Sequence, residues 1–339
     1  MKKVAIVGAL WTSNFGDVLL AKLLKEKLES LGHSIIMPNA SDKVKVESGL
    51  LEEKFTISEA DIFLFCGGGY FSEPPGNSFK WAISRYKLLF KYATFCRVKK
   101  IPYSILGVGA GPINSNLAKS VIKHVCKGAN LIALRDPTSV NAVSTLVPNS
   151  EIIEVADYVL SLKDKILLND VDLSHKKIGF HITLNGGKYI PAVIDYLNDI
   201  DNNSDVFFIE DHPGEFSRVC EKYPEVKRFF DGNVLGYKDV DQFIHDMNEL
   251  SCIVTSKLHV GIVASALGKK VCSIPYHAKV ERLYESFDRS DLCLVDFNDK
   301  NKIADHIKYC LEAEPVSIPQ VLINKSREID YIIEKIVKQ

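Results

Sequence analysis

The chain has 339 residues, of which 46% are hydrophobic and 25% are charged, and its formal net charge is -1. This composition is that of an ordinary globular protein and excludes a disordered or nucleic-acid-binding chain as the first expectation, while the length predicts two domains of about 150 residues each. The charge is unevenly divided, because residues 1–165 carry 21 Lys+Arg and 15 Asp+Glu whereas the remainder carry 21 and 28. The first half is therefore the one suited to an anionic partner.

The eight cysteines are scattered without a C-x-x-C pair, and several lie inside apolar runs. This usage indicates a reducing compartment and argues against a disulfide framework or a zinc site. The first eleven residues imitate a short signal peptide, but they lack a small-residue cleavage site, so we interpret them as the first strand. No apolar run reaches the ~18 residues that span a bilayer. We therefore expect a cytoplasmic protein.

The first strand, Lys3–Gly8, leads through a loop into a helix predicted over Val18–Leu31, where leucines recur at helical spacing. Asn14 and Asp17 lie near the start of this helix. From its position alone, Asp17 is interpreted as a plain N-cap.

Three glycines, Gly67, Gly68 and Gly69, follow the predicted strand Asp61–Cys66. Glycines at the carboxyl end of a strand let the backbone approach a ligand closely and expose N–H groups. A structural turn is the alternative interpretation.

Residues 79–100 contain seven basic residues, six aromatic residues and no acidic residue. Helical spacing predicts a core-facing stripe of Ala82, Tyr86, Leu89, Ala93 and Cys96, with Lys80, Lys87 and Lys91 on the opposite side. One interpretation is a solvated basic face on a core helix. The other is peripheral contact with an anionic membrane surface.

Further elements continue the alternation, with a strand at Pro102–Gly109, a helix at Leu117–Cys126 and a strand at Leu131–Asp136. Arg135 lies at the carboxyl end of this last strand. A charged residue there is rarely buried alone, so Arg135 either pairs with Asp136 or binds an anion.

In the second half, Lys163–His175 is polar enough for an interdomain linker, and strands are predicted at Lys177–Ile182 and Asp205–Ile209. Glu210, Asp211 and His212 follow the second strand, but three adjacent residues do not reach one ion from a strand end, so we expect no metal site. Helices are predicted at Val240–Leu250, Ile303–Leu311 and Ile329–Val337.

The most informative stretch runs from a short strand, Ser251–Thr255, through Ser256, Lys257 and His259 into a small-residue helix that ends at Gly268. A second strand, Lys270–Ile274, then leads to Tyr276 and Lys279. An imidazole beside a helix N-terminus, with an ammonium opposite, makes a pocket for a small anion. The alternative is that His259 is a hydrogen-bonded core histidine and Lys279 a solvated loop residue.

Several of these segments resemble the polysaccharide pyruvyl transferase family. The matching motifs are Asn14-Phe15-Gly16-Asp17, Gly67-Gly68-Gly69, Arg135-Asp136-Pro137-Thr138-Ser139, Lys257-Leu258-His259 and Tyr276-His277-Ala278-Lys279. One position departs from the family pattern, because Lys257 stands where an arginine is usual. Lysine keeps the charge but loses the bidentate fork of a guanidinium.

Alternating strands and helices in both halves predict two Rossmann-like α/β domains, residues 1–165 and 166–339, that face each other across a cleft. The resemblance implies the glycosyltransferase-B arrangement, with the last helix returning to the first domain, the acceptor on the first domain and phosphoenolpyruvate on the second. It also implies transfer of the enolpyruvyl unit of phosphoenolpyruvate onto two hydroxyls of a polysaccharide sugar, which forms a pyruvate ketal and releases phosphate.

The resemblance further implies a role for each candidate residue. His259 and Asp17 are the candidate catalytic residues. Residues expected to bind substrate are Arg135, Lys279, Lys257, Asn14, Gly67, Gly68, Gly69, Ser256 and Tyr276. We expect no cofactor and no metal, since phosphoenolpyruvate is itself the donor substrate.

Two rival functions stay open, namely a nucleotide-sugar glycosyltransferase of the same fold and a non-catalytic saccharide-binding relative. The expected partners are phosphoenolpyruvate and a saccharide acceptor, with a lipid-linked acceptor as one candidate, and no nucleic acid. Contact through residues 79–100 would place the protein at the inner face of the membrane. The sequence does not identify the acceptor sugar, its linkage or the oligomeric state.

Overall fold

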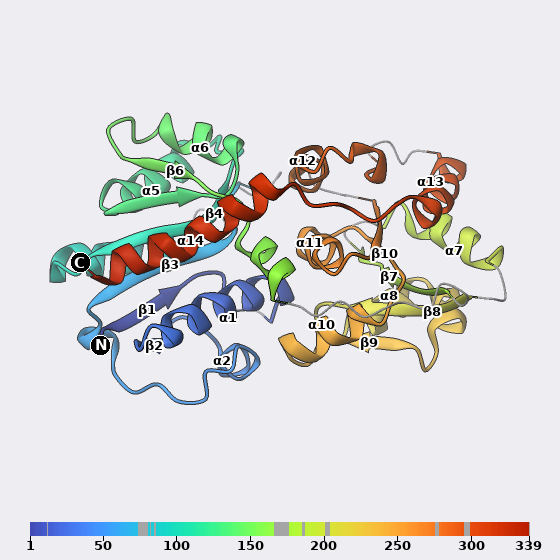
Figure 1. The fold of residues 1–339 in the computed structure, drawn as a ribbon, viewed down its shortest axis with the longest axis horizontal. Helices are drawn as coiled ribbons and strands as arrows, with labels where there is room; N and C mark the ends of the chain where they lie inside the picture. Colours follow the sequence, from blue (N-terminus) through green and yellow to red (C-terminus); the bar gives the residue numbers. More distant parts are fainter. Residues whose placement is uncertain are drawn as a thin grey trace. The chain divides into compact units, whose positions relative to one another are not determined.

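The computed structural model describes residues 1–11, 13–73, 81, 83–84, 86–165, 176–184, 187–200, 204–274, 278–294 and 299–338 (Figure 1). The chain folds as two compact units. Unit 1 comprises Met1–Ser161 together with the C-terminal segment from Gln320, and unit 2 comprises Leu162–Pro319. The boundary predicted after residue 165 therefore lies four residues beyond the observed one (165 minus 161), and the last helix belongs to unit 1.

Unit 1 is built on a six-stranded sheet with the strand order β2-β1-β3-β4-β5-β6 and parallel pairing throughout. The strands are β1 (Lys3–Val7), β2 (Ser34–Ile36), β3 (Ile62–Phe71), β4 (Tyr103–Ala110), β5 (Leu131–Leu134) and β6 (Ile152–Glu154). Strands β1, β3 and β4 are almost continuously buried, as expected for a parallel sheet that is covered on both faces.

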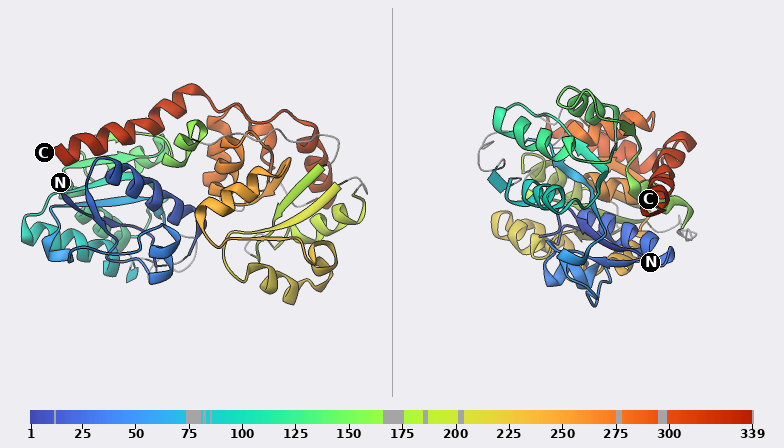
Figure 2. Two further views of the ribbon diagram at one scale, coloured as in Figure 1. Left: turned by 60° about the horizontal axis from the view of Figure 1, so that its bottom comes forward. Right: turned by 90° about the vertical axis from the view of Figure 1, so that its left-hand side faces the viewer.

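Helices of unit 1 are α1 (Phe15–Ser30), α2 (Asp42–Glu47), α4 (Lys91–Lys99), α5 (Asn116–Lys127), α6 (Pro137–Ser144) and α14 (Gln320–Lys338). A π-helical turn at Tyr86–Phe90 precedes α4, and 3-10 turns occupy Ile57–Glu59 and Tyr158–Asp164. Figure 1 shows α1 and α14 in front of β1, β3 and β4, and Figure 2 shows both chain termini at the same end of this unit.

Two elements of unit 1 begin or end elsewhere than predicted. Helix α1 starts at Phe15, three residues before the predicted start, because the Asn14 side chain caps it by accepting a hydrogen bond from the Asp17 amide. The interpretation of Asp17 as the N-cap is therefore wrong, and Asp17 lies in the first turn. Strand β3 continues through the three glycines to Phe71, with an irregular register against β4 beyond Gly68.

The basic segment at residues 79–100 is helical where it is described. Leu89, Ala93 and Cys96 are buried and confirm that part of the predicted stripe. Phe79, Lys80, Ala82 and Arg85 lie outside the described residues, as do the side chains of Tyr86 and Lys87. Lys91 at the start of α4 is exposed, as are Arg97, Val98, Lys99 and Lys100 at its end.

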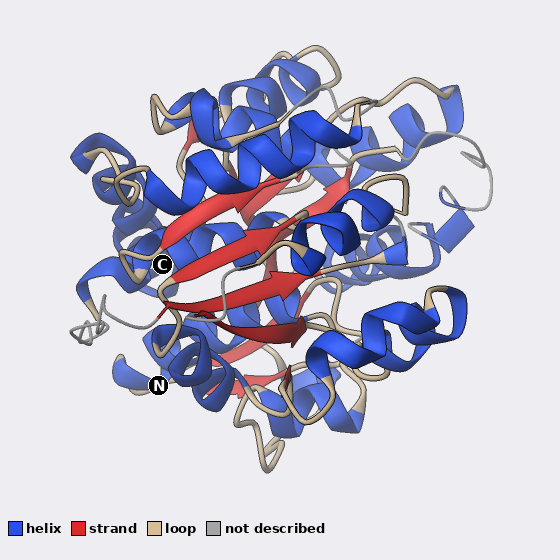
Figure 3. Ribbon diagram, turned by 90° about the vertical axis from the view of Figure 1, so that its right-hand side faces the viewer, coloured by secondary structure: helices blue, strands red, loops and turns tan. Residues whose placement is uncertain are grey.

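Unit 2 has a five-stranded parallel sheet with the order β11-β10-β7-β8-β9. The strands are β7 (Lys176–His181), β8 (Ser204–Glu210), β9 (Val234–Gly236), β10 (Cys252–Thr255) and β11 (Lys270–Ser273). Its helices are α7 (Ile190–Asn198), α8 (Glu215–Lys222), α9 (Lys227–Phe230), α10 (Val240–Asn248), α11 (Leu258–Ala266), α12 (Ala278–Ser286) and α13 (Lys300–Glu312), with short 3-10 turns at Pro224–Val226 and Ser290–Leu292. Figure 3 shows strands of the fold flanked by helices.

Within the described parts of the chain, no helix combines the length and apolarity needed to cross a membrane. All eight cysteines carry free thiols. Asn185, Gly186 and most of the predicted linker, residues 166–175, are outside the described residues.

The C-terminal helix is fastened to unit 1 by both apolar and polar contacts. It begins directly after Pro319, nine residues before the predicted start (329 minus 320), and buries one face that includes Ile329 and Ile333. Lys27 on α1 pairs with Glu334 at 2.7 Å, and the Tyr158 hydroxyl donates to Asp330. The predicted return of the last helix to the first domain is confirmed.

Truncation of the buried face of α14 should destabilise unit 1. Ile333 is fully buried, so Ile333→Ala should lower the free energy of unfolding by about 2–5 kcal/mol, because it removes buried methyl groups and leaves a cavity. Tyr331 on the same helix is 71% exposed, and Tyr331→Ala should change stability by no more than about 0.5 kcal/mol. Urea unfolding followed by circular dichroism measures the free energy of unfolding of both variants. Equal losses of this free energy in Ile333→Ala and Tyr331→Ala would show that the buried face of α14 does not hold the unit together.

Candidate active site

Each sheet reverses its strand order at one place, and the described candidate residues lie along the carboxyl edges of the two sheets. In unit 1 the reversal lies between β1 and β3, and in unit 2 it lies between β7 and β10. Open parallel sheets bind ligands outside the carboxyl ends of strands at such switch points. Each unit therefore has one edge at which a site is expected.

At the unit 1 switch point, Asp17 from α1 lies directly against Gly68 of β3. A Cβ atom at Gly68 would stand 2.6 Å from the Asp17 Oδ1 atom, and Gly68 also has a positive φ of 92°. A larger residue there would both strain the backbone and displace the carboxylate. The glycines and the Asn14-x-x-Asp17 segment thus form one local structure at the carboxyl edge, and their place in a substrate cleft stays a prediction.

Arg135 follows β5 at the same edge and is buried, with carboxylates on two sides. Its guanidinium lies 3.3 Å from the Asp157 carboxylate and 3.5 Å from Asp136. A Cβ atom at Gly109 would come within 2.5 Å of the guanidinium, so the glycine makes room for it. Pairing of Arg135 with Asp136 is therefore observed, and Asp157 is a partner that the sequence analysis missed. Direct contact of Arg135 with a substrate anion stays a prediction.

In unit 2, Ser256, Lys257 and His259 connect β10 to α11. Ser256 is buried and accepts a hydrogen bond from the Tyr189 hydroxyl at 3.2 Å. Lys257 is the N-cap residue of α11, and His259 lies in the first turn of that helix. The predicted strand, loop and small-residue helix are all confirmed here.

Lys279 lies in the first turn of α12, which follows β11, the strand paired with β10. Helices α11 and α12 pack closely, because a Cβ atom at Gly261 would stand only 2.8 Å from the Tyr284 hydroxyl oxygen. His259 and Lys279 thus occupy the starts of two neighbouring helices at one sheet edge. Tyr276 lies outside the described residues. Asp17 and Arg135 belong to unit 1, whereas His259 and Lys279 belong to unit 2.

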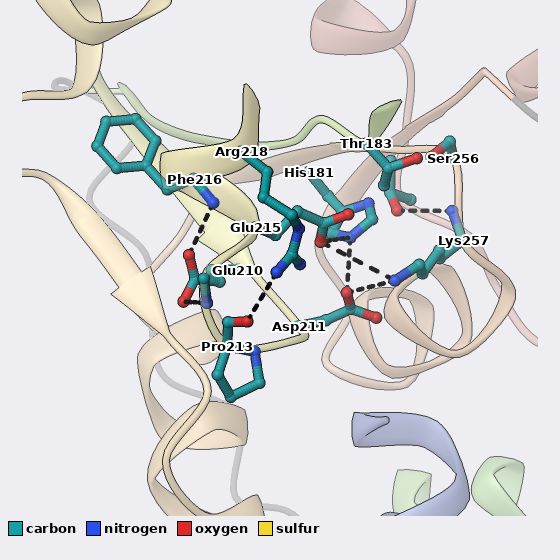
Figure 4. Close-up of polar contacts among 12 residues, drawn as sticks. His181, Thr183, Glu210, Asp211, Pro213, Glu215, Phe216, Arg218, Ser256 and Lys257 are labelled. Atoms are coloured by element: carbon teal, nitrogen blue, oxygen red, sulfur yellow. Dashed lines mark hydrogen bonds and ion pairs between the residues drawn. The ribbon is translucent and has the colours of Figure 1, made fainter. Parts of the chain in front are cut away.

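A buried charge cluster that the sequence analysis did not assemble surrounds Lys257 (Figure 4). The Lys257 ammonium lies 2.5 Å from the Asp211 Oδ1 atom and 4.0 Å from Glu215. His181, the last residue of β7, places its Nε2 atom 3.0 Å from the same Asp211 oxygen and 3.7 Å from Glu215. The only sequence signal was that His181 and Asp211 each come at the end of a strand.

Two carboxylates face two basic groups in this cluster, so the charges balance. Burial opposes a charged imidazole, but the Asp211 carboxylate, the hydrogen bond to it and the nearby Glu215 carboxylate raise the pKa of His181 above its ordinary value. Burial likewise opposes ionisation of Asp211, yet His181 and Lys257 hold the pKa of Asp211 well below its usual range.

His181, Asp211 and Glu215 also form a set of donors that could hold a metal ion. In the structure a cation already faces this set, because the Lys257 ammonium approaches the same Asp211 oxygen as His181 does. Asp211 and Glu215 therefore serve first to hold the Lys257 side chain in place and to compensate its positive charge. The objection that adjacent residues do not reach one ion does not apply to this set, since His181 comes from β7 and Asp211 and Glu215 are four residues apart.

Asp211→Asn should lower the pKa of His181, because it removes the carboxylate that stabilises the imidazolium. A raised pKa means that His181 contributes stability fully below its unfolded value of about 6.5 and that this stability is lost as pH rises through the folded pKa. As pH rises, the free energy of unfolding should therefore fall less in Asp211→Asn than in the unchanged protein. Proton NMR titration of His181 and urea unfolding across pH measure the two effects, and Asp231→Asn, at an exposed position, is the control. An unchanged His181 titration in Asp211→Asn would contradict the assigned cause.

Comparison with solved structures identifies the fold. The UDP-GlcNAc 2-epimerase from Neisseria meningitidis bound to UDP-GlcNAc aligns over 100% of both chains with a TM-score of 0.64 and 12% identity. The S. aureus MnaA-UDP co-structure gives 0.63 and 12% over 100% of this chain and 97% of that chain. Anabaena Alr3699/HepE in complex with UDP and glucose gives 0.59 and 12% over 100% of both. The predicted glycosyltransferase-B-like pair of Rossmann-like domains is confirmed, and identities this low show the fold alone.

Sequence comparison supplies the family. No curated protein sequence matches the chain at a significant level. A sequence model of polysaccharide pyruvyl transferases matches residues 14–278, which is most of the chain. The match begins at Asn14, the cap of α1, and ends one residue before Lys279. The predicted resemblance is thereby confirmed, and the chain belongs to the polysaccharide pyruvyl transferase family.

Proposed function

We propose that the protein transfers the enolpyruvyl group of phosphoenolpyruvate to a sugar of a cell-surface polysaccharide or its precursor, forming a pyruvate ketal. The observation that carries this proposal is the placement of His259 and Lys279 in the first turns of two helices that follow paired parallel strands. Helix N-termini provide N–H donors and partial positive charge, and an ammonium adds a full charge. This edge suits a ligand that carries both a carboxylate and a phosphate. The family match supports a polysaccharide-modifying enzyme.

The reaction adds two hydroxyl oxygens of one sugar to C2 of phosphoenolpyruvate. One hydroxyl adds across the C=C bond, and the methylene carbon takes a proton and becomes a methyl group. The second hydroxyl then displaces the phosphate, which leaves as the C–O bond breaks, and the proton of that hydroxyl is taken up by the released phosphate or by a base. The chemistry therefore needs a group that moves protons near neutral pH, and an imidazole is suited to this. We assign that role to His259, with Asp17 as the catalytic carboxylate on the acceptor side.

We assign binding roles from the matching motifs and from the place of each cation at its sheet edge. The Lys257 ammonium lies 2.5 Å from Asp211. We therefore propose that Lys257 both holds the site together through this ion pair and contributes positive charge toward the substrate anion. The carboxylates beside Arg135 would orient its guanidinium, which has five N–H donors and can serve several acceptors. We assign the phosphoenolpyruvate anion chiefly to Lys279, which lies in the first turn of α12 beside the start of α11. Ser256, Tyr276, Asn14 and the glycines Gly67, Gly68 and Gly69 complete the proposed substrate contacts.

A nucleotide-sugar glycosyltransferase activity is the alternative. The observation in its favour is that the three similar solved structures are described with UDP or UDP-GlcNAc bound. Absorbance of a co-purified nucleotide, or a rise in melting temperature with UDP but none with phosphoenolpyruvate, would favour it. A third possibility, a non-catalytic saccharide-binding relative, is favoured by Lys257 at the arginine position and predicts no phosphate release with any acceptor.

His259→Ala and Lys279→Ala should damage different kinetic quantities. Loss of a charged hydrogen bond costs about 1.5–3 kcal/mol, so Lys279→Ala should weaken the apparent affinity for phosphoenolpyruvate roughly tenfold or more. General acid–base catalysis contributes roughly 100-fold to 10,000-fold, so His259→Ala should lower turnover by that factor while phosphoenolpyruvate still raises the melting temperature.

Phosphate release from phosphoenolpyruvate, with nitrophenyl and lipid-linked glycosides as acceptors, measures both variants. Each assay is run with and without EDTA, because we propose that cationic side chains and no metal serve the chemistry. His245→Ala, at an exposed position on α10, is the matched control and should behave as the unchanged protein. A folded His259→Ala protein with near-normal turnover would remove His259 from the mechanism, and full inactivation by EDTA that magnesium reverses would refute the metal-free proposal.

We also propose that the basic segment at residues 79–100 contacts an anionic membrane surface and brings the enzyme to lipid-linked acceptors at its inner face. The described end of α4 supports this, because Val98 is exposed among Arg97, Lys99 and Lys100. Each basic residue near such a surface contributes on the order of 1 kcal/mol, which salt screens.

The triple change of Arg97, Lys99 and Lys100 to Glu should abolish cosedimentation with phosphatidylserine vesicles at low salt. The same charge change at Lys222, Lys227 and Lys238, which are exposed in unit 2, is the control and should leave cosedimentation unchanged. Equal loss in both variants would indicate a nonspecific charge effect, and no loss in either would rule out the α4 surface.

A further inference from the structure

Unit 2 contains a second cluster of ligand-type side chains, distant in sequence from one another and separate from the charge cluster around Lys257. Cys272 comes from β11, and His306 and Cys310 come from α13. One donor atom of each residue lies within 4.8 Å of the donor atoms of the other two. Cys272 and Cys310 are fully buried, whereas His306 is half-buried and offers a route from solvent.

Two spacings around the His306 Nε2 atom match the edges of a tetrahedron around one zinc ion. Zinc bonds of about 2.3 Å to sulfur and about 2.0 Å to nitrogen place the two ligands roughly 3.6 Å apart in tetrahedral geometry. The Cys310 Sγ atom lies 3.6 Å from the His306 Nε2 atom. The carbonyl oxygen of Leu292 lies 3.3 Å from the same nitrogen, close to the roughly 3.4 Å expected between nitrogen and oxygen ligands of one zinc ion.

The local structure also presents the ligands together. His306 and Cys310 are four residues apart on one helix, so they project from consecutive turns on the same face, as in helical zinc motifs. Cysteine binds metal as the thiolate.

Two other interpretations explain less of this arrangement. Buried thiols can pack as small apolar groups, but that would not require an imidazole nitrogen among them. A disulfide would use the two sulfur atoms alone and would leave the approach of His306 to Cys310 unexplained. The set of His181, Asp211 and Glu215 differs from this cluster, because the Lys257 ammonium already supplies a positive charge beside its carboxylates.

We propose that Cys272, His306 and Cys310 bind a thiophilic divalent ion, zinc, with the Leu292 carbonyl at or near the fourth position. Such an ion would join α13 to the edge strand β11, from which the chain continues toward Lys279. The site would be structural, since a closed set of protein ligands leaves no position for substrate. This inference is independent of the pyruvyl transfer proposed above.

The test uses the full-length protein, purified without a histidine tag and first stripped of metal with a chelator under reducing conditions. Titration with Co²⁺ should produce the visible absorption of a tetrahedral ion and a thiolate-to-cobalt charge-transfer band, both saturating at one ion per chain. Addition of Zn²⁺ should remove both bands. Cys310→Ala and Cys272→Ala should weaken Co²⁺ binding roughly 100-fold or more.

Cys252→Ala is the matched control, because Cys252 is a buried thiol on the neighbouring strand β10 and is not a member of the cluster. It should bind Co²⁺ as the unchanged protein does. If a variant fails to fold, metal analysis of the unchanged protein isolated from zinc-containing medium still decides the matter, with one zinc per chain expected. Absence of the cobalt bands and of zinc in the unchanged protein would overturn the proposal. So would bands that persist in Cys310→Ala, or a Cys272–Cys310 disulfide found by mass spectrometry in the protein as isolated from zinc-containing medium.

Discussion

Parallel pairing of every strand is the constraint on which the rest of this structure depends. Because all strands of a unit run the same way, their carboxyl ends lie at one edge, and each loop there leads into the N-terminus of a helix. Backbone N–H groups and partial positive charge accumulate at that edge without any particular side chain. In unit 1 this places Asp17 and Arg135 at the same edge, and in unit 2 it places His259 and Lys279 at adjacent helix starts.

The same edge concentrates basic side chains in partly buried positions, and the structure compensates them locally. Arg135 faces Asp136 and Asp157, while Lys257 and His181 face Asp211 and Glu215. A buried ion pair contributes little net stability compared with an apolar pair, but removing one partner is costly because it leaves a buried charge alone. We therefore regard Asp157 and Asp211 as residues that hold basic groups in place at the sheet edge.

Close approach at glycines sets the fine geometry of both units. Asp17 lies against Gly68, the Arg135 guanidinium lies against Gly109, and Tyr284 of α12 lies against Gly261 of α11. In each case a Cβ atom would stand less than 3.0 Å from a side-chain atom. These glycines are therefore packing requirements, and two of them are next to residues that we assign to the chemistry. Interpretation of the triple glycine as a simple turn is excluded for Gly67 to Gly69, which lie inside strand β3.

The sequence by itself determined the alternating α/β order, the family and most of the candidate residues, because buried strands and amphipathic helices leave periodic apolar patterns that are local in the chain. It determined helix starts less well, since Asn14 and not Asp17 caps α1 and α14 begins nine residues early (329 minus 320). Only the tertiary structure decided which side chains meet. Asp157 pairs with Arg135 across 22 positions, Asp211 with Lys257 across 46, and Cys272 approaches Cys310 across 38 (310 minus 272). Such contacts leave no periodic signal, because strand order and crossover connections, rather than spacing along the chain, bring the residues together.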